Sequence, residues 1–141
     1  PKHGQVFVSV NDYDKRTVHV VAQRLAELNF KILATKGTAK VLREHGVEVT
    51  VIDKHNEGQN NALTLLKKNE INLIINTPSG KKSQSDMRSI RAAAILHNIP
   101  CITTLQGAWA AVYGIDAYLK EEFTVESLQN LYLSNNQEVG S

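Results

Sequence analysis

One segment of the chain combines side chains that bind anions. An apolar run over residues 73–75 leads directly into an amide, two hydroxyls, a glycine and two lysines. The proline and the glycine of this segment favour a tight turn, and the other groups are hydrogen-bond donors or positive charges. The residues that we expect to face an anion are Asn76, Thr77, Ser79, Gly80 and Lys81. A surface turn with two solvated lysines is the alternative, and this segment alone does not exclude it.

A second segment has the same chemistry. The apolar residues 32–34 are followed by Thr35, Lys36, Gly37 and Thr38. Gly37 can adopt a positive φ or let an anion approach the backbone, and Thr38 can cap a following helix. A helix cap and a turn explain these residues equally well without a ligand. The presence of two such segments in one chain favours a shared anion site.

The two segments follow predicted strands. Five apolar or β-branched runs each precede an amphipathic segment, and this alternation predicts a parallel sheet with helices on both faces. The expected strands cover residues 5–10, 31–34, 47–52, 71–75 and 101–103. The expected helices cover residues 15–29, 38–45, 61–69, 86–97, 108–115 and 125–131. The fold class is therefore α/β, a doubly wound parallel five-stranded sheet sandwiched by helices.

Ligands of such sheets lie at the carboxyl ends of the strands, beside the helix N-termini. Ser9 ends the first expected strand, Lys15 begins the helix after it, and Lys54 follows the third strand. Both ammonium groups could reach the region above the two polar segments, although each lysine alone is more often a surface charge. A phosphate there would gain charge-assisted hydrogen bonds from several strand ends at once.

Length and composition fit one globular domain. The chain has 141 residues, 42% of them hydrophobic and 21% charged, and no apolar run approaches the roughly 20 residues of a membrane helix. We expect a domain over residues 1–132 and a flexible tail over residues 133–141. The single cysteine, Cys101, cannot form an internal disulfide, which favours a cytoplasmic location. Because the chain begins at Pro1 and has no signal-peptide pattern, we expect a module of a longer protein.

The charge distribution argues against a nucleic-acid partner. The net charge is +2, and residues 114–141 carry five acids and one lysine, so that about +6 remains on the first 113 residues. This excess is dispersed, whereas duplex binding usually needs a clustered basic face. The positive charge is nevertheless sufficient to bind a small anion.

Candidate catalytic groups are few. The five histidines have no HExxH or other metal-ligand spacing, so we expect no metal site. The GxxxxGK[ST] and GxGxxG patterns are absent, and with them the usual signs of nucleoside triphosphate hydrolysis and dinucleotide binding. Asp12 and Asp14 follow the first strand and could supply a base, but carboxylates near a helix start more often cap the helix.

The order of these pieces resembles the methylglyoxal-synthase-like domains, and among them the C-terminal allosteric domains of bacterial carbamoyl-phosphate synthase large subunits. The resemblance covers nearly the whole chain. The matching blocks are Val8-Ser9-Val10 with Asp14-Lys15, residues 34–39, Lys54 with Glu57-Gly58, residues 74–80, Ile90-Arg91, and Thr103-Thr104-Leu105. No single block identifies the family, but their ordered set is specific.

The resemblance implies a non-catalytic allosteric domain that binds nucleoside monophosphates, with UMP as inhibitor and IMP as activator. The residues that match the family's phosphate pocket are Lys15, Thr35, Thr38, Lys54 and Asn76. Further candidate contacts with the effector are Ser9, Lys36, Gly37, Thr77, Ser79, Gly80 and Lys81. The family also has a threonine where this chain has Pro78, which offers neither a hydroxyl nor an N–H.

The resemblance also implies the surroundings of the domain. The parent protein would be an ATP-dependent ligase that makes carbamoyl phosphate for pyrimidine and arginine biosynthesis. Its partners would be the other domains of the large subunit and the glutaminase small subunit, with no nucleic acid and no membrane. ATP and a divalent metal, Mg or Mn, are expected only in the catalytic domains, and no cofactor in this one. Regulation by ornithine and homo-oligomerisation are left open.

An enzymatic alternative comes from the same family. Methylglyoxal synthases resemble this chain but carry an aspartate base where it has Thr77, and a first-strand histidine where it has Asn11. Asp12 matches an aspartate of these enzymes, whereas residues 81–91 lack the histidine of their following loop. The alternative function is therefore a divergent methylglyoxal synthase that acts on dihydroxyacetone phosphate with Asp12 as base.

Overall fold

The computed structural model describes residues 4–52, 61–78 and 80–139 of the chain. The strands are β1 (Gly4–Ser9), β2 (Phe30–Ala34), β3 (Thr50–Val51), β4 (Leu73–Asn76) and β5 (Cys101–Ile102). The helices are η1 (Asp14–Arg16), α1 (Val18–Glu27), α2 (Lys36–Glu44), α3 (Ala62–Lys67), α4 (Gly80–Leu96) and α5 (Leu105–Val139). Strands and helices alternate along the chain, as the hydrophobic pattern predicts.

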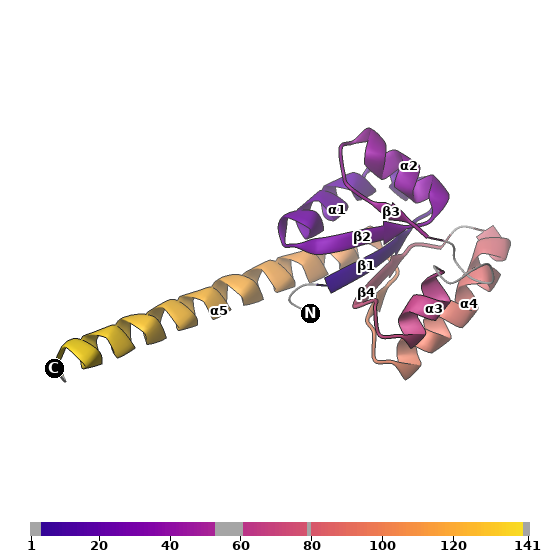
Figure 1. The fold of residues 1–141 in the computed structure, drawn as a ribbon. Coiled ribbons are helices and arrows are strands. Elements are labelled where there is room, and N and C mark those ends of the chain that lie inside the picture. Colours follow the sequence, from indigo (N-terminus) through magenta and orange to yellow (C-terminus); the bar gives the residue numbers. More distant parts are fainter. Residues whose placement is uncertain (1–3, 53–60, 79, 140–141) are drawn as a thin grey trace.

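The strands form one parallel sheet in the order β3-β2-β1-β4-β5. The chain builds outward from the central strand β1 to β3, then crosses back to β4 and builds outward on the other side (Figure 1). This confirms the predicted doubly wound five-stranded α/β fold. The direction of winding changes between β1 and β4, where Ser9 pairs in register with Asn76. In open α/β sheets this switch point is the usual place of a ligand.

Helices cover both faces of the sheet, with α1 and α2 on one side and α3 and α4 on the other (Figure 1). Successive residues of β1 point to opposite faces, so Val6 and Val8 join the core under α1, α2 and α5, while Phe7 joins the core under α3 and α4. All three side chains are buried to 99% or more. The central strand is thus covered on both faces, as its nearly continuous apolar sequence predicts.

Three helices are followed by an asparagine in the left-handed conformation. Asn29, Asn69 and Asn98 have φ values of 73°, 60° and 57° and follow α1, α3 and α4. Asparagine tolerates this conformation better than other residues with a Cβ, and it commonly ends helices. The predicted ends of these helices lie within two residues of the observed ones.

The structure differs from the prediction at several helices. α2 begins at Lys36 instead of residue 38, so Thr35 is the N-cap residue and Thr38 lies within the first turn. α4 begins at Gly80 instead of residue 86, so Gly80 and Lys81 belong to the first turn of a helix and not to a loop. The polar run before residue 86 suggested a loop, but its lysines and glutamine are good helix formers. The helices expected over residues 108–115 and 125–131 are parts of one helix, α5, because residues 116–124 contain neither glycine nor proline.

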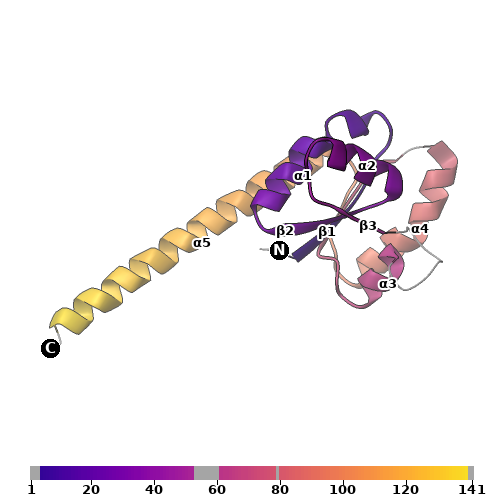
Figure 2. The ribbon, with the colours of Figure 1, turned by 45° about the horizontal axis from the view of Figure 1, so that its top comes forward.

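Beyond its first turns, α5 extends away from the sheet (Figure 2). The helix includes most of the residues for which we expected a flexible tail, and the helical assignment by itself does not test that expectation. Within the part of the chain that the structure describes, no helix has both the length and the hydropathy needed to cross a membrane.

A histidine pair joins α1 to the end of α2. The rings of His19 and His45 stack with centroids 3.7 Å apart and planes 10° apart. His45 Nδ1 lies 2.9 Å from the carbonyl oxygen of Val41, whereas the buried Nδ1 of His19 has no hydrogen-bond partner among the described residues. Burial and, second, the charge of His45 lower the pKa of His19 below its ordinary value of 6.5.

We expect this pair to make folding weaker in mild acid. A histidine with a lowered folded-state pKa contributes its full stability above about pH 6.5, and the contribution is lost as the pH falls toward the folded-state pKa. Urea denaturation at about pH 7.5 and about pH 5.5 should show a smaller loss of unfolding free energy for His19→Gln than for the wild type. His97→Gln, which lies outside the pair, is the control. An equal loss in wild type and His19→Gln would contradict the prediction.

Candidate functional site

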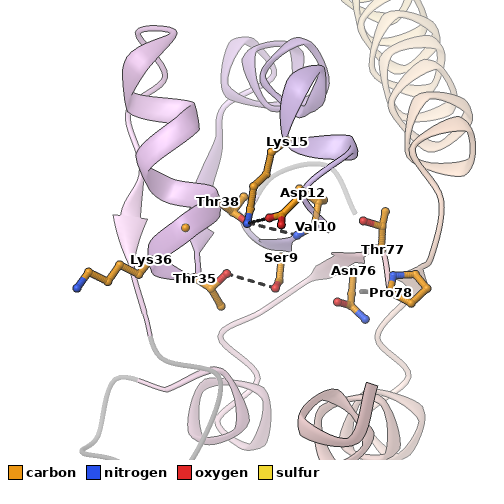
Figure 3. A pocket seen from close by; sticks show the side chains of 11 residues that line it. Ser9, Val10, Asp12, Lys15, Thr35, Lys36, Thr38, Asn76, Thr77 and Pro78 are labelled. Atoms are coloured by element: carbon orange, nitrogen blue, oxygen red, sulfur yellow. Dashed lines mark hydrogen bonds and ion pairs between the residues drawn. The ribbon is translucent and has the colours of Figure 1, made fainter. Parts of the chain in front are cut away.

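A cavity of about 440 Å³ lies at the carboxyl ends of β1, β2 and β4, beside the switch point of the sheet. Its walls come from the segments that follow these three strands (Figure 3). The residues that line it are Ser9, Val10, Asp12, Lys15, Thr35, Lys36, Gly37, Thr38, Asn76, Thr77 and Pro78. The two polar segments of the sequence analysis therefore meet at one place.

The cavity contains four of the five residues for which we predicted phosphate contacts, namely Lys15, Thr35, Thr38 and Asn76. Lys54, the fifth, lies outside the described residues, as does Ser79. Of the further candidates, Ser9, Lys36, Gly37 and Thr77 line the cavity. Lys36 does so near its backbone, because its side chain extends away from the other labelled side chains (Figure 3). Gly80 and Lys81 lie in the first turn of α4.

The N-terminus of α2 opens toward the cavity. Thr35 precedes the helix with extended backbone angles and makes no capping hydrogen bond with its side chain. Its hydroxyl donates instead to Ser9 Oγ at 3.2 Å. The first N–H groups of a helix have no partner within the helix, and together with the helix dipole they favour an anion. Thr35 thus joins β2 to β1 and leaves these donors available.

Gly37 makes room for the ammonium group of Lys15. A Cβ atom added at Gly37 would lie 3.2 Å from Lys15 Nζ and 3.6 Å from its Cε. The Lys15 side chain therefore lies over the first turn of α2, where its charge adds to that of the helix end. Any larger residue at position 37 would crowd this lysine.

Lys15 forms an ion pair at the rim of the cavity. Its Nζ donates to Asp12 Oδ1 at 2.7 Å, and the side chain of Asp12 is 97% exposed while that of Lys15 is 27% exposed. The hydrogen bond and the charge of Lys15 lower the pKa of the Asp12 carboxyl. Asp12 is therefore a weaker base than an isolated carboxylate. An exposed pair of this kind is easily exchanged for another anion.

Two buried threonines hold the segment after β1. Thr38 Oγ1 accepts a hydrogen bond from the backbone N–H of Val10 at 3.3 Å, and Thr77 Oγ1 accepts one from that of Asn11 at 2.8 Å. Asn11 Nδ2 donates to the carbonyl oxygen of Pro78 at 3.0 Å. In both threonines the hydroxyl oxygen is an acceptor within the protein, so its proton remains to be donated. The segment that carries Asp12 and Lys15 is thereby fixed to β4 and α2.

Asn76 has a partner that sequence analysis did not identify. In the amide orientation that satisfies its neighbours, Asn76 Nδ2 donates to the carbonyl oxygen of Ser9 at 3.1 Å, and Oδ1 accepts from the Arg91 guanidinium at 2.7 Å. Asn76 is 3% exposed. Arg91 belongs to α4, fifteen positions further along the chain. The Ile90-Arg91 pair was part of the family resemblance, but no local signal connected it with Asn76.

Among the residues that the structure describes, the arrangement offers donors for an anion but no catalytic pair. Its polar groups are an ammonium, a helix N-terminus, hydroxyls and an amide, all of which can donate to a phosphate. The carboxylate of the cavity, Asp12, is ionised and paired with Lys15. Burial raises the pKa of the Cys101 thiol, which makes a thiolate nucleophile less accessible. Within the described residues, no three His, Cys, Asp or Glu side chains gather to hold a metal ion.

The chain is similar in sequence to known proteins. A sequence model of the family described as "MGS-like domain" matches residues 17–103. The chain is 46% identical over 133 residues to the carbamoyl phosphate synthase large chain of Rubrobacter xylanophilus, covering 94% of this chain and 13% of that protein. It is 49% identical over 132 residues to the C-terminal section of the large chain of Methanocaldococcus jannaschii, covering 93% of this chain and 21% of that protein.

The solved structures similar to this chain include the methylglyoxal synthase of Elizabethkingia anophelis, with a TM-score of 0.62 and 16% identity. The match covers 79% of this chain and 78% of that one. At 16% sequence identity, this similarity shows only that the two proteins share a fold. The chain spans only about an eighth to a fifth of the synthase large chains that it matches.

Proposed function

The chain belongs to the MGS-like domain family, and we propose that it is the allosteric domain of a glutamine-dependent carbamoyl phosphate synthase large chain. In this proposal the domain binds a nucleoside monophosphate, with UMP as inhibitor and IMP as activator. It catalyses no reaction itself. Support comes from relatives that are carbamoyl phosphate synthase large chains and match over 93% to 94% of this chain.

The observation that carries the proposal is the convergence of Lys15, Thr35, Thr38 and Asn76 on one cavity. These residues come from three segments distant in sequence. Lys15, Thr38 and Asn76 each offer a donor suited to a phosphate. The Thr35 hydroxyl donates to Ser9 and so leaves the hydroxyl proton of Ser9 available to a ligand. Methylglyoxal synthases, which resemble this chain, carry their catalytic base at the position of Thr77. The Thr77 hydroxyl oxygen instead accepts a hydrogen bond from the backbone N–H of Asn11. Among the described residues of the cavity, the one carboxylate, Asp12, is paired with Lys15, which favours anion binding over catalysis.

We place the domain in the following setting. It comprises residues 1–132, followed by a flexible tail over residues 133–141. The parent protein is a cytoplasmic ligase of pyrimidine and arginine biosynthesis, which works with a glutaminase small subunit. ATP and Mg or Mn act in its catalytic domains, whereas this domain needs only its effector.

The binding step involves an exchange of partners at Lys15. The exposed carboxylate of Asp12 holds the ammonium group at 2.7 Å, and an effector phosphate would replace it. Once it has lost Lys15, the exposed carboxylate of Asp12 can make a new contact with a neighbouring domain, while the backbone of its segment stays fixed by Thr38 and Thr77. A coupling of about 1–3 kcal/mol between the two sites is typical of allosteric proteins and suffices for a severalfold to 100-fold change in substrate affinity. UMP and IMP must make different contacts in the two states to have opposite effects.

Pro78 bears on which effector the domain binds and how tightly. The family pocket has a threonine at this position, and the neighbouring Thr77 already accepts a hydrogen bond from Asn11 at 2.8 Å. The Thr77 hydroxyl can still donate its proton, so it can replace the missing group in part. Effector affinity should then depend more heavily on Lys15 and the N-terminus of α2.

A thermal-shift titration with UMP, IMP, inorganic phosphate and dihydroxyacetone phosphate tests the proposal. An effector at 100 times its dissociation constant should add about 2.7 kcal/mol to the free energy of unfolding. We expect UMP or IMP to raise the melting temperature of the wild type, and Lys54→Ala to remove most of the rise. No shift with either nucleotide would refute the proposal. Release of inorganic phosphate from dihydroxyacetone phosphate would favour a divergent methylglyoxal synthase instead.

A further inference from the structure

The side chain of Asn76 is held between the central strand and a helix on the far side of the sheet. Its Nδ2 donates to the carbonyl oxygen of Ser9 in β1, and its Oδ1 accepts from Arg91 in α4. The Ser9 carbonyl also accepts the backbone N–H of Thr77 at 3.1 Å. Asn76 is 3% exposed and lines the cavity. Its amide is therefore restrained by two protein groups at the bottom of the anion site.

These two contacts leave one donor of the amide for a ligand. A side-chain amide has two N–H donors and one oxygen that accepts. One N–H is directed to Ser9, and the oxygen is directed to Arg91. The second N–H has no hydrogen-bond partner among the residues that the structure describes, and the cavity lies on the open side of Asn76. A donor in this place suits an anion, whereas the oxygen would repel one.

Arg91 is the contact that selects this orientation. If the amide turned by 180°, its oxygen would face the Ser9 carbonyl oxygen and its NH₂ group would face the guanidinium, so both contacts would be repulsive. The hydrogen bond from Arg91 is short, at 2.7 Å, and involves a charged donor, which makes it the stronger of the two restraints. Without Arg91, only the 3.1 Å bond to Ser9 would oppose reorientation.

We propose that Arg91 is a positioning residue of the anion site, which acts through Asn76 by keeping the N–H of its amide, and not its oxygen, toward the cavity. This inference rests on the proposed function, because it assigns a role in the same site. Arg91 does not line the cavity among its described residues, so it acts without touching the ligand. Arg91 therefore affects the affinity of the site for an anion.

A double-mutant cycle with inorganic phosphate as the probe tests the inference. The proteins are the wild type, Arg91→Met, Asn76→Ala and the double variant. Arg88→Met is the matched control, because it removes the same charge from an exposed position of α4. We expect Arg91→Met to weaken phosphate binding about tenfold, the size of one lost hydrogen bond, and to have no further effect once Asn76 is alanine. Arg88→Met should stay within about twofold of the wild type.

The side-chain amide of Asn76 gives a second readout that a merely structural role would not move. Compared at the same degree of saturation with phosphate, its NMR signals, identified by their loss in Asn76→Ala, should shift in the wild type and in Arg88→Met but not in Arg91→Met. Arg91→Lys, which keeps one charged donor, should retain binding within about threefold. If Arg91→Met does not fold, Arg91→Leu, which also lacks a donor, takes its place in the cycle, with the same expectation.

The outcomes separate this inference from the proposed function. If the wild type binds neither phosphate nor a nucleoside monophosphate, the proposed function fails, and the inference fails with it. If the wild type binds but Arg91→Met weakens binding equally with and without Asn76, Arg91 acts by its own charge and only the inference fails. The same holds if Arg91→Met binds as tightly as the wild type.

Discussion

The Lys15→Met variant is expected to bind phosphate or a nucleoside monophosphate about 10- to 100-fold more weakly than the wild type. A hydrogen bond from a charged group to a ligand contributes about 1.5–3 kcal/mol, and each 1.4 kcal/mol is a factor of about ten. Lys15 Nζ lies over the first turn of α2, 3.2 Å from the Cβ position at Gly37, so its charge acts where the helix donors also converge. Isothermal titration calorimetry at low and at moderate salt measures the loss.

Asp12→Asn is the matched control for this prediction, because it changes the other member of the same ion pair. Asp12 is 97% exposed and competes with a ligand for Lys15 at 2.7 Å. Its neutralisation should strengthen phosphate binding, by up to about fivefold, since exposed pairs are weak. Opposite changes in the two variants would establish the exchange at Lys15. If both variants bind as the wild type does, Lys15 is only a surface charge.

Asp12→Asn also separates regulation from catalysis. In a divergent methylglyoxal synthase, Asp12 would be the base, and its neutralisation would abolish phosphate release from dihydroxyacetone phosphate. The lowered pKa of its carboxyl, caused by the hydrogen bond and charge of Lys15, makes it a weaker base. The regulatory proposal expects tighter binding and no turnover in either protein. One variant therefore gives different results under the two functions.

The fold could be predicted from the sequence because its signals are local. Each strand is a short apolar run, and α1, α3 and α4 end before an asparagine that adopts a positive φ. The carboxyl ends of parallel strands lie at one edge of a sheet, so the placement of Thr35 and Asn76 in one region followed from topology. The cavity joins them with Lys15. The hydrophobic pattern and the topology of a parallel sheet were together sufficient to predict that Thr35 and Asn76 lie in one site.

The interactions that could not be predicted depend on tertiary distances. Gly37 looked like a turn residue, but its lack of a Cβ also leaves room for Lys15, which no spacing rule indicates. The contact between Asn76 and Arg91 requires the actual start of α4, and that start was predicted six residues too late. The continuity of α5 was missed because a polar stretch without glycine or proline suits both a helix and a loop. Packing against distant parts of the chain decides whether such a stretch is a helix or a loop.

The Asn76→Asp variant is expected to lose nearly all phosphate affinity while remaining folded. Asn76 is 3% exposed, and a carboxylate in its place would keep the Arg91 guanidinium, now at 2.7 Å from Oδ1, as a charged partner. The second carboxylate oxygen would lie 3.1 Å from the Ser9 carbonyl oxygen, a repulsion that lowers stability, but the charge of Arg91 favours the ionised form. The negative charge would then face the ligand. At about 4 Å and an effective dielectric constant of about 20, two unit charges repel by about 4 kcal/mol.

This repulsion corresponds to a loss of about 1,000-fold in affinity, whereas Asn76→Ala, which removes only a donor, should lose about tenfold. The difference between the two variants isolates the effect of charge from the loss of the hydrogen bond. Equilibrium dialysis with radiolabelled phosphate measures both, and urea denaturation verifies that Asn76→Asp is folded. If the aspartate and alanine variants were equally weak, the ligand would not approach Asn76. The anion would then lie closer to α2, and the amide held by Ser9 and Arg91 would serve only to join β1, β4 and α4.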